Sequence, residues 1–450
     1  MMKANKIIKL FKGTVIHSIE IGKVEILPNS LIGIDEDGVI QHMKSNYEDL
    51  KQLEKDVTMI CTDNGINEQE SVIDMGNKFL IPGFIDTHAH APQYHNAGTG
   101  TDLPLLKWLE KYTFPVESKF KDLIFAENVY GKVVDRMLRH GTTTCCYYAT
   151  IHLEASELLA EIVSKRGQRA FIGKVCMDRH SPDHYVETTE QSISNTKEFV
   201  DRILAKGNPL VQPIVTPRFA PSCTDELMVA LGNLSHEKQT LIQSHLSENK
   251  DEIEWVKSLY PGIESYTHVY KHFNLLNERT IMAHCVHLSD EEIKLISTQQ
   301  TAISHCPISN FTLSSGNLDV RKVLEANIKL GLGSDISGGY HPSILQVIRD
   351  SIKCSNSHFF NNGNHTPLTF EEAFYLATVG GSKVVNLDHR IGNFIVGKDF
   401  DAQIIDPFVQ NSPFDCFDGE TLKDIFQKFI YLGDDRNLSS LYIKGNKIKF

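Results

Sequence analysis

Two histidines separated by one residue, His88 and His90, follow an apolar run (FLIPGFID) and precede a loop rich in Gly, Asn, Thr and Asp. In an extended strand alternate side chains point to the same side, so both imidazoles can reach one point. Neutral imidazole is a common zinc ligand, and two ligands on one strand require others from elsewhere in the fold. A surface or capping pair is the alternative interpretation, and the position at the exit of a strand favours the metal.

Other apolar runs end in the remaining ligand types. LIQSHLSEN offers His245 and Glu248, IMAHCVH offers His284, and GLGSD offers Asp335. A complete zinc shell is formed by four side chains, His88, His90, His245 and Asp335, with water as an exchangeable ligand. Glu248 and His284 are then left for proton transfer. Taken singly, each histidine could be a hydrogen-bonded core residue and the aspartate a helix N-cap. Their joint occurrence at strand ends favours chemistry.

Further histidine patterns are expected to lie outside this site. Five histidines in polar or loop-flanked segments are predicted on the surface: His180, His184, His268, His272 and His287. His152-Leu153-Glu154 matches half of the cytidine-type zinc deaminase motif, but the P-C-x-x-C half is absent from the sequence. That motif is therefore discounted.

From Lys78 onward, β-type apolar runs alternate with longer amphipathic stretches, a pattern typical of repeated βα units and a parallel sheet. The runs are KFLIPGFIDTHAH, HGTTTCCYYAT, RAFIGKVCMD, PLVQPIVTPRFAPS, TLIQSHLSE, TIMAHCVHLS, TAISHCPIS and IKLGLGSDISGG. Their number predicts a TIM-type (β/α)8 barrel with its site at the carboxyl ends of the strands. A doubly wound open sheet is the alternative, weakened because no Gly-x-Gly-x-x-Gly turn follows the first run.

The barrel is expected over residues 78–388, with a small β-sandwich domain formed from both termini. Residues 1–77 supply short β-type runs with Gly and Asp-Gly turn signals, then at 44–70 a helix and a loose insertion without an assigned function. Residues 389–450 supply further β-type runs and the helix TLKDIFQKFIY. This arrangement would bring the two termini together.

Composition narrows the classes of partner. The 450 residues are 41% hydrophobic and 23% charged, as in ordinary globular proteins, and a net charge of -12 argues against nucleic acid or anionic membrane. The sequence lacks a membrane-spanning run and a signal peptide, so a cytoplasmic protein acting on a small neutral molecule is expected. Nine scattered cysteines without C-x-x-C spacing argue against a disulfide framework or a cysteine zinc site.

Several longer motifs carry a family resemblance over nearly the whole chain. They are PGFIDTHAHAPQY, TDLPLLKWLEKYTFPVE, VTPRF, IQSHLSEN, MAHC, ISHCPISN, LGLGSDISGGY, IGNFIVGKDFDA and QKFIYLGDDRN. Together they resemble the amidohydrolase superfamily and, within it, the guanine deaminase family. The segment DLPLLKWLEKYTFP and the pairing of VTPRF with SHLSEN are the specific signals. Departures lie in loops, at HPSI after Gly339 and around residues 361–365, and bear on substrate tolerance and stability.

The resemblance implies hydrolytic deamination of guanine to xanthine and ammonia, with one zinc ion on His88, His90, His245 and Asp335. Glu248 would shuttle protons, and His284 and Asp335 would act on the attacking water. The implied substrate contacts are His90, Gln93, Arg218, Phe219, His245, Glu248 and Asp335. Two-metal members of the superfamily use a lysine at the end of strand four, where this chain has TPRF, so a single metal is implied. A homodimer is also implied.

Alternative functions stay open from the sequence. One is another aminohydrolase on this scaffold, acting on a different purine, a pyrimidine or a triazine. Another is a non-catalytic protein that keeps the fold, although such proteins have lost metal ligands that this chain retains. Arg218 could donate to the carbonyl at ring position six of guanine, where adenine carries an amino group. Alternatively, Arg218 pairs with a carboxylate to hold the barrel rim.

Overall fold

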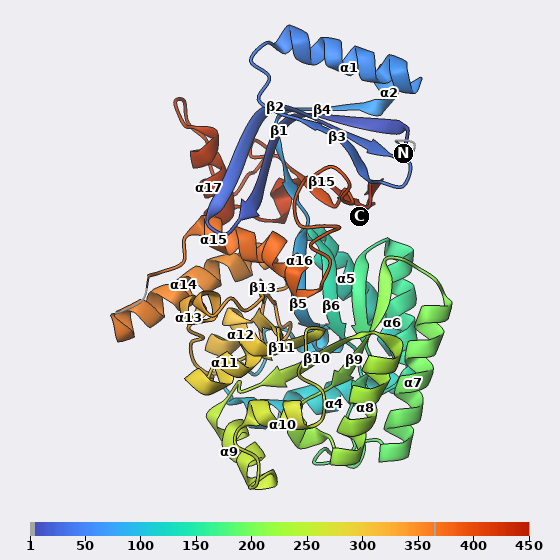
Figure 1. Ribbon diagram of the computed structural model, residues 1–450, viewed down its shortest axis with the longest axis vertical. Coiled ribbons are helices and arrows are strands. Elements are labelled where there is room, and N and C mark those ends of the chain that lie inside the picture. Colours follow the sequence, from blue (N-terminus) through green and yellow to red (C-terminus); the bar gives the residue numbers. More distant parts are fainter. Residues whose placement is uncertain (1–4, 364–365, 450) are drawn as a thin grey trace.

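The computed structural model describes residues 5–363 and 366–449. Its larger domain is built around eight parallel strands (Figure 1). In spatial order they are β13 (Leu330–Leu332), β12 (Ala302–His305), β11 (Thr280–His284), β10 (Leu241–Leu246), β9 (Val211–Pro217), β7 (Arg169–Gly173), β6 (Thr142–Tyr148) and β5 (Phe84–His90), and a short β8 (Val175–Cys176) pairs with β9. Each predicted run contains one of these strands. The barrel prediction is confirmed, and the open-sheet alternative is wrong.

Hydrogen bonds from β5 to the last residue of β13 and to the loop after it join the first and last strands. Thr87 Oγ1 donates to the Leu332 carbonyl at 3.0 Å, and the Asp335 amide donates to the His88 carbonyl at 2.9 Å. The His90 amide then donates to the Ile336 carbonyl at 2.9 Å. This closure places the residues that follow β13 directly against the His-x-His strand.

Helices cover the outside of the barrel. The longer ones are α5 (Leu123–Arg139), α6 (Leu153–Arg166), α7 (Thr189–Ala205), α8 (Asp225–Lys238), α9 (Lys250–Leu259), α10 (Tyr266–His272), α11 (Asp290–Thr298) and α14 (Ile344–Asn362). Shorter ones are η1 (Ala91–Asn96), α3 (Leu105–Trp108), η2 (Leu109–Thr113), α4 (Phe114–Glu117), η3 (Ser118–Lys121), η4 (Ala220–Ser222), α12 (Pro307–Thr312), α13 (Val320–Glu325), α15 (Phe370–Tyr375), η5 (Leu376–Gly380) and α16 (Gly381–Val384). In the described residues, no helix is long and apolar enough to cross a bilayer.

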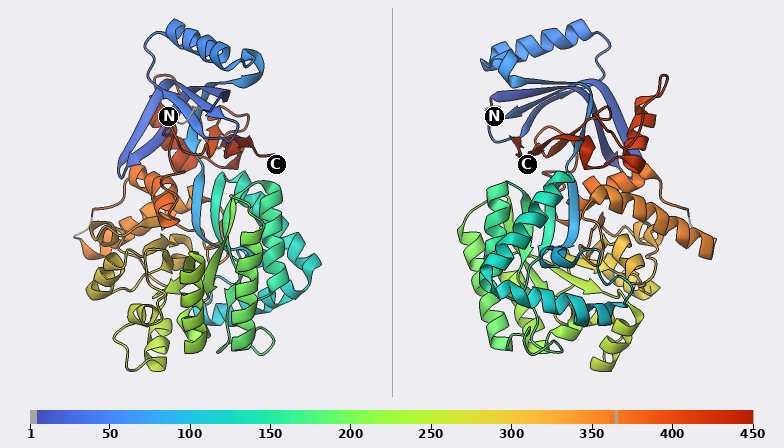
Figure 2. Two further views of the ribbon diagram at one scale, coloured as in Figure 1. Left: turned by 45° about the vertical axis from the view of Figure 1, so that its right-hand side comes forward. Right: turned by 180° about the vertical axis from the view of Figure 1, so that it is seen from behind.

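A separate seven-stranded mixed sheet contains strands from both ends of the chain (Figure 2). Its order is β16 (Asn446–Lys447), β15 (Leu438–Ile443), β14 (Ala402–Ile405), β4 (Val72–Pro82), β1 (Ile7–Glu20), β2 (Lys23–Asp35) and β3 (Ile40–Lys44). Strands from both ends of the chain therefore share one sheet, as predicted. Of the loop departures noted in the sequence, residues 364 and 365 lie outside the described residues.

This sheet differs from the predicted β-sandwich because its two apolar faces are covered by other elements. Leu10 faces α1 (Leu50–Asn64), and its neighbour Phe11 faces the opposite side, where it stacks on Phe400 at 4.3 Å between ring centroids. The helix and the C-terminal segment thus take the place of a second sheet. The remaining helical segments are α2 (Glu68–Ser71), α17 (Leu422–Leu432) and η6 (Asp435–Asn437).

The chain changes from the sheet to the barrel at Gly83, a few residues later than the expected boundary at residue 78. β4 pairs with β14 as far as Pro82. The apolar run is buried both at the end of β4 and along β5, so its hydrophobicity does not mark where one part ends and the other begins. A Cβ on Gly83 would lie 2.1 Å from Thr143 Oγ1, so this close crossing requires glycine. The sheet thus lies at the amino end of β5 and leaves the carboxyl ends of the strands open.

Candidate metal centre and active site

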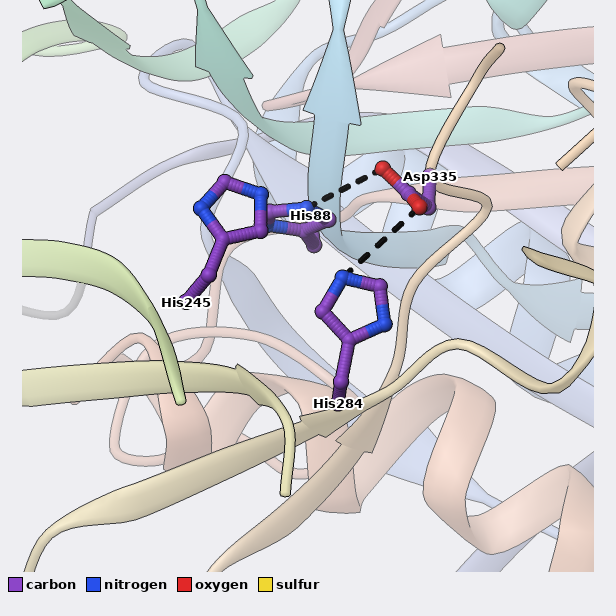
Figure 3. A group of neighbouring side chains, drawn as sticks. All are labelled: His88, His245, His284 and Asp335. Carbon is purple, nitrogen blue, oxygen red and sulfur yellow. Dashed lines mark ion pairs between the residues drawn. The ribbon is translucent and has the colours of Figure 1, made fainter. Parts of the chain in front are cut away.

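Ligand atoms from the ends of three strands and one loop converge on a single point. His88 of β5, His245 of β10, His284 of β11 and Asp335 after β13 each offer one atom, and these atoms all lie within 4.8 Å of one another (Figure 3). His88 Nε2 lies 3.1 Å from Asp335 Oδ1, and His284 Nε2 lies 3.7 Å from Oδ2. The barrel thus brings together ligand groups that are up to 247 positions apart in the sequence, from His88 to Asp335.

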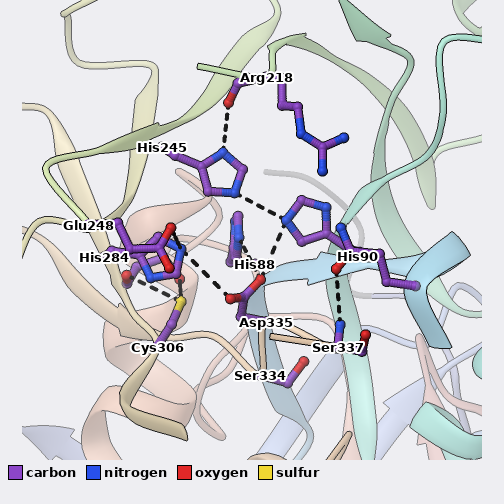
Figure 4. Close-up of polar contacts among 12 residues, drawn as sticks. His88, His90, Arg218, His245, Glu248, His284, Cys306, Ser334, Asp335 and Ser337 are labelled. Atoms are coloured by element: carbon purple, nitrogen blue, oxygen red, sulfur yellow. Dashed lines mark hydrogen bonds and ion pairs between the residues drawn. The ribbon is translucent and has the colours of Figure 1, made fainter. Parts of the chain in front are cut away.

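His90 joins the same cluster. Its Nε2 lies 3.1 Å from His245 Nε2 and 3.4 Å from Asp335 Oδ1 (Figure 4). The sequence pattern places His90 in the metal shell and His284 beside it, and the structure brings both imidazoles to the carboxylate. Every metal-ligating and catalytic residue named from the sequence therefore lies in this cluster or, for Glu248, at its edge.

Hydrogen bonds on the far side of two rings orient their lone pairs inward. His245 Nδ1 lies 2.7 Å from the Arg218 carbonyl oxygen, and His284 Nδ1 lies 2.9 Å from Asn310 Oδ1. A carbonyl oxygen only accepts, so each Nδ1 carries the proton and each Nε2 is left with its lone pair. The Nε2 atoms of His90 and His245 lie 3.1 Å apart, so both rings turn this nitrogen toward the cluster. The donor set therefore fits a metal ion.

The protonation states also suit a divalent cation. Burial lowers the pKa of His88, and it lowers those of His90 and His245 well below 6.5. Burial alone would raise the pKa of Asp335, but the hydrogen bond from His88 and the neighbouring imidazoles lower it below its usual range. Neutral imidazoles and an ionised carboxylate follow, as zinc requires.

Glu248 lies beside this cluster, and its pKa is shifted in the opposite direction to that of Asp335. Burial, followed by the negative charges of Asp335 and Glu252, raises its pKa well above the usual carboxyl value. Its Oε2 lies 3.4 Å from His284 Nε2. The site thus pairs a carboxylate whose pKa is lowered with a carboxyl group whose pKa is raised.

Left-handed backbone conformations turn the site residues inward at the strand ends. Ser247, immediately before Glu248, has φ of 50°, His284 has 68° and Asp335 has 45°. Such values are strained for residues other than glycine and concentrate at functional sites. Gly333, just before this turn, packs so closely that a Cβ would lie 2.8 Å from His88 Cβ.

A cavity of about 410 Å³, partly open to solvent, adjoins the cluster. Its apolar wall consists of Leu105, Trp108, Leu109, Phe219 and Leu313. All seven substrate contacts named from the sequence line it: His90, Gln93, Arg218, Phe219, His245, Glu248 and Asp335.

Arg218 lines the cavity and pairs with a carboxylate, as the alternative interpretation expected; its contact with a purine stays a prediction. Its Nη1 lies 2.6 Å from Glu117 Oε2, and its Nη2 lies 3.2 Å from Oε1. Figure 4 shows the guanidinium next to the ring of His90, whose pKa it helps to lower. One N–H of each terminal nitrogen serves Glu117, and the other N–H groups remain for a ligand.

The histidines predicted on the surface lie outside the cluster. His180, His184 and His272 are exposed, and His268 Nε2 lies 3.4 Å from Glu264 Oε2, just before its own helix. His287 is partly buried, with Nε2 2.7 Å from the Ser315 carbonyl. His152 begins α6, where its ring stands 5.8 Å from that of Tyr185.

Sequence reasoning gave no role to Glu117 and Asn310. Both lie in motifs that carry the family resemblance, TFPVE and ISHCPISN, and this was the available signal. Their partners, Arg218 and His284, are far from them in the chain. Only the closed barrel shows which groups they orient.

Comparison with known proteins places the chain among proteins of like length and fold. The amidohydrolase family model matches residues 79–448. A guanine deaminase of Rattus norvegicus is 47% identical over 444 residues, 98% of this chain and 96% of that protein. A guanine deaminase of Escherichia coli (strain K12) is 37% identical over 381 residues, 84% of each. The crystal structure of guanine deaminase from C. acetobutylicum, with bound guanine in the active site, has a TM-score of 0.89 and 40% identity, and the match covers 98% of this chain and 100% of that one.

Proposed function

The chain belongs to the amidohydrolase family, and from this premise we propose that it catalyses the hydrolytic deamination of guanine to xanthine and ammonia. The observation that carries the proposal is the joint lining of one partly open cavity by imidazoles of the candidate metal centre, a carboxyl group with a raised pKa and a guanidinium. Relatives with this activity match nearly the full chain and support the choice of substrate. Formation of xanthine from guanine by the zinc-loaded protein tests it.

The proposed cofactor is one zinc ion per chain, held by His88, His90, His245 and Asp335. Buried neutral imidazoles and an ionised carboxylate form the donor set that zinc prefers. When bound, the ion would lower the pKa of a coordinated water toward neutrality. Support for a single ion comes from strand four of the barrel, β9, which is followed by Arg218 rather than by a bridging lysine.

The protons of the reaction would be handled by the chain's own residues. His284 Nε2 and Asp335 Oδ2 face each other at 3.7 Å, so they are placed to orient the attacking water and take its proton. Glu248 holds a proton that it can donate to the ring nitrogen beside the carbon bearing the amino group. A second transfer, to the amino nitrogen, lets ammonia leave while the water oxygen stays on the ring carbon.

Arg218, Gln93 and Phe219 would recognise the purine. A guanidinium N–H facing the carbonyl at ring position six makes a charge-assisted hydrogen bond. The amino group of adenine at that position would leave the same donor unpaired in a desolvated pocket, and such sites reject the wrong substrate by about 10⁴–10⁵-fold. Phe219 is buried in the cavity wall, edge-on to Trp255 at 5.9 Å between ring centroids, and supplies a flat apolar contact.

Arg218→Ala is expected to lower kcat/KM for guanine by about 10- to 100-fold and to shrink the preference for guanine over adenine. The reason is the loss of a hydrogen bond to a charged donor, which contributes roughly 1.5–3 kcal/mol. Steady-state kinetics with both purines measure this. Arg218→Lys, which keeps the charge beside Glu117 but not the bidentate fork, is the matched variant.

Two outcomes would make Arg218 a purely structural residue. One is a variant that loses activity only through unfolding, seen as a lower melting temperature at unchanged specificity. The other is a folded variant that keeps its full preference for guanine. In either case recognition would lie with Gln93 or with the backbone.

We further propose a homodimer, which the family resemblance implies, and the cytoplasmic location expected from the sequence. Light scattering of the purified protein should give twice the mass of one chain, and the monomer mass would contradict the dimer. Fractionation of cells that produce the protein should recover its activity in the cytosol.

A further inference from the structure

Glu117, the last residue of α4, has a fully buried carboxylate that accepts hydrogen bonds from three other side chains. Arg218 donates to both of its oxygens, at 2.6 and 3.2 Å. Gln93 Nε2 donates to Oε1 at 2.9 Å, and the Tyr185 hydroxyl donates to Oε2 at 2.8 Å. These donors follow three different strands, β5, β9 and β8, so one carboxylate joins three segments of the barrel rim.

Burying a carboxylate is unfavourable unless it is paired and hydrogen-bonded. Here the Arg218 guanidinium supplies the opposite charge, and Gln93 and Tyr185 supply the remaining hydrogen bonds. Gln93 and Arg218 line the cavity, whereas Glu117 lies behind them, out of contact with solvent. The carboxylate therefore acts on a ligand only through its two cavity-lining partners.

The pairing fixes what Gln93 and Arg218 present to a ligand. A carboxylate paired with a guanidinium only accepts, so Gln93 must turn its NH₂ group toward Glu117. Its carbonyl oxygen then faces away from Glu117 and accepts a hydrogen bond from the Ser337 amide at 3.4 Å. A carbonyl oxygen has two lone pairs, so one is left for a ligand. The bidentate contact likewise sets the plane of the Arg218 guanidinium. The cavity thus presents an amide acceptor and guanidinium donors in fixed positions.

Guanine carries a ring N–H and a carbonyl side by side, and a fixed acceptor beside a fixed donor matches that edge. We propose that Glu117 is the positioning residue for recognition of this edge, acting through Gln93 and Arg218 and not on the reacting atoms. The inference rests on the proposed function, because guanine is the ligand it assigns. It predicts an effect on KM, since Glu248 and His284 are held by other elements.

The test is a double-mutant cycle of Glu117→Gln and Arg218→Ala, with kcat, KM, zinc content and melting temperature measured for each. Glutamine keeps the shape of Glu117 but turns an NH₂ group toward its donors. Glu117→Gln should raise KM for guanine about 10-fold or more, change kcat by less than about 3-fold and leave zinc in place. In the Arg218→Ala background the same substitution should change KM by about 3-fold or less, because its main partner is gone.

Glu187→Gln is the matched control for breaking a buried ion pair. Glu187 accepts from the buried Lys174 at 2.7 Å, away from the cavity, so this variant should lower the melting temperature with KM unchanged. Tyr185→Phe removes one donor to Glu117 without touching Arg218 or Gln93, and its KM should also stay near that of the wild type. If Glu117→Gln does not fold, Glu117→Asp keeps the charge, shortens the reach and should show the same rise in KM.

Each other result overturns the inference. An unchanged KM in folded Glu117→Gln, or a KM effect that adds fully to that of Arg218→Ala, would make Glu117 a structural residue while the proposed function stands. An effect confined to kcat would place it in the chemistry instead. A wild-type protein without guanine turnover would overturn the proposed function, and this inference with it.

Discussion

Glu248→Gln is expected to lower kcat for guanine by at least about 10²–10⁴-fold, the usual contribution of a general acid–base group. Glutamine keeps the shape of the side chain but carries no transferable proton. Glu248 is buried, and burial together with the nearby charges of Asp335 and Glu252 raises its pKa, which favours the protonated form. Zinc content and melting temperature should stay near the wild-type values. The measurement is single-turnover kinetics on protein with verified zinc content.

The competing role for Glu248 is a carboxylate that stabilises the start of the following helix. That role is already filled, because Asn249 and Glu252 form the capping box of α9. The matched control is Glu292, which occupies in the capping box of α11 the position that Glu252 occupies in that of α9. Glu292→Gln should lower stability and leave kcat unchanged. A folded, zinc-loaded Glu248→Gln with near-normal kcat would move the proton shuttle elsewhere.

Removal of the metal is expected to abolish turnover, and one zinc ion per chain is expected to restore it. No other group in the described site can generate hydroxide at neutral pH. His88→Ala removes the imidazole nearest to Asp335 Oδ1, at 3.1 Å, and should lose both zinc and activity. Elemental analysis of protein purified with and without a chelator gives the stoichiometry.

His287→Ala is the control for a partly buried histidine near the cluster but outside it. It should retain its zinc. Two metal ions per chain, or unchanged zinc content in His88→Ala, would overturn the ligand assignment. The first result would also show that a second ion needs no lysine at the end of β9.

Much of the site was predictable because it depends on two periodicities. The strand repeat puts His88 and His90 on one side of β5, and the barrel rule puts the ends of β10, β11 and β13 around them. Neither rule needs a knowledge of side-chain packing. For the same reason the eight strands could be located from apolar runs alone.

What the sequence did not reveal depends on contacts between distant segments. The pair Glu117–Arg218 is separated by 101 positions, and no local pattern marks it. The left-handed turns at His284 and Asp335 occur at non-glycine residues, which seldom adopt positive φ, so the sequence does not mark them. The same limit explains the small domain, where a helix and the segment around Phe400 cover the faces that we assigned to a second sheet.

The most direct test is to mix the zinc-loaded protein with guanine and to measure ammonia and xanthine together. Equal amounts of the two products are expected, with no ammonia released from adenine at a comparable rate and none released from guanine by Glu248→Gln. Folded protein carrying one zinc ion per chain that leaves guanine unchanged, or that deaminates another purine, a pyrimidine or a triazine faster, would contradict the account.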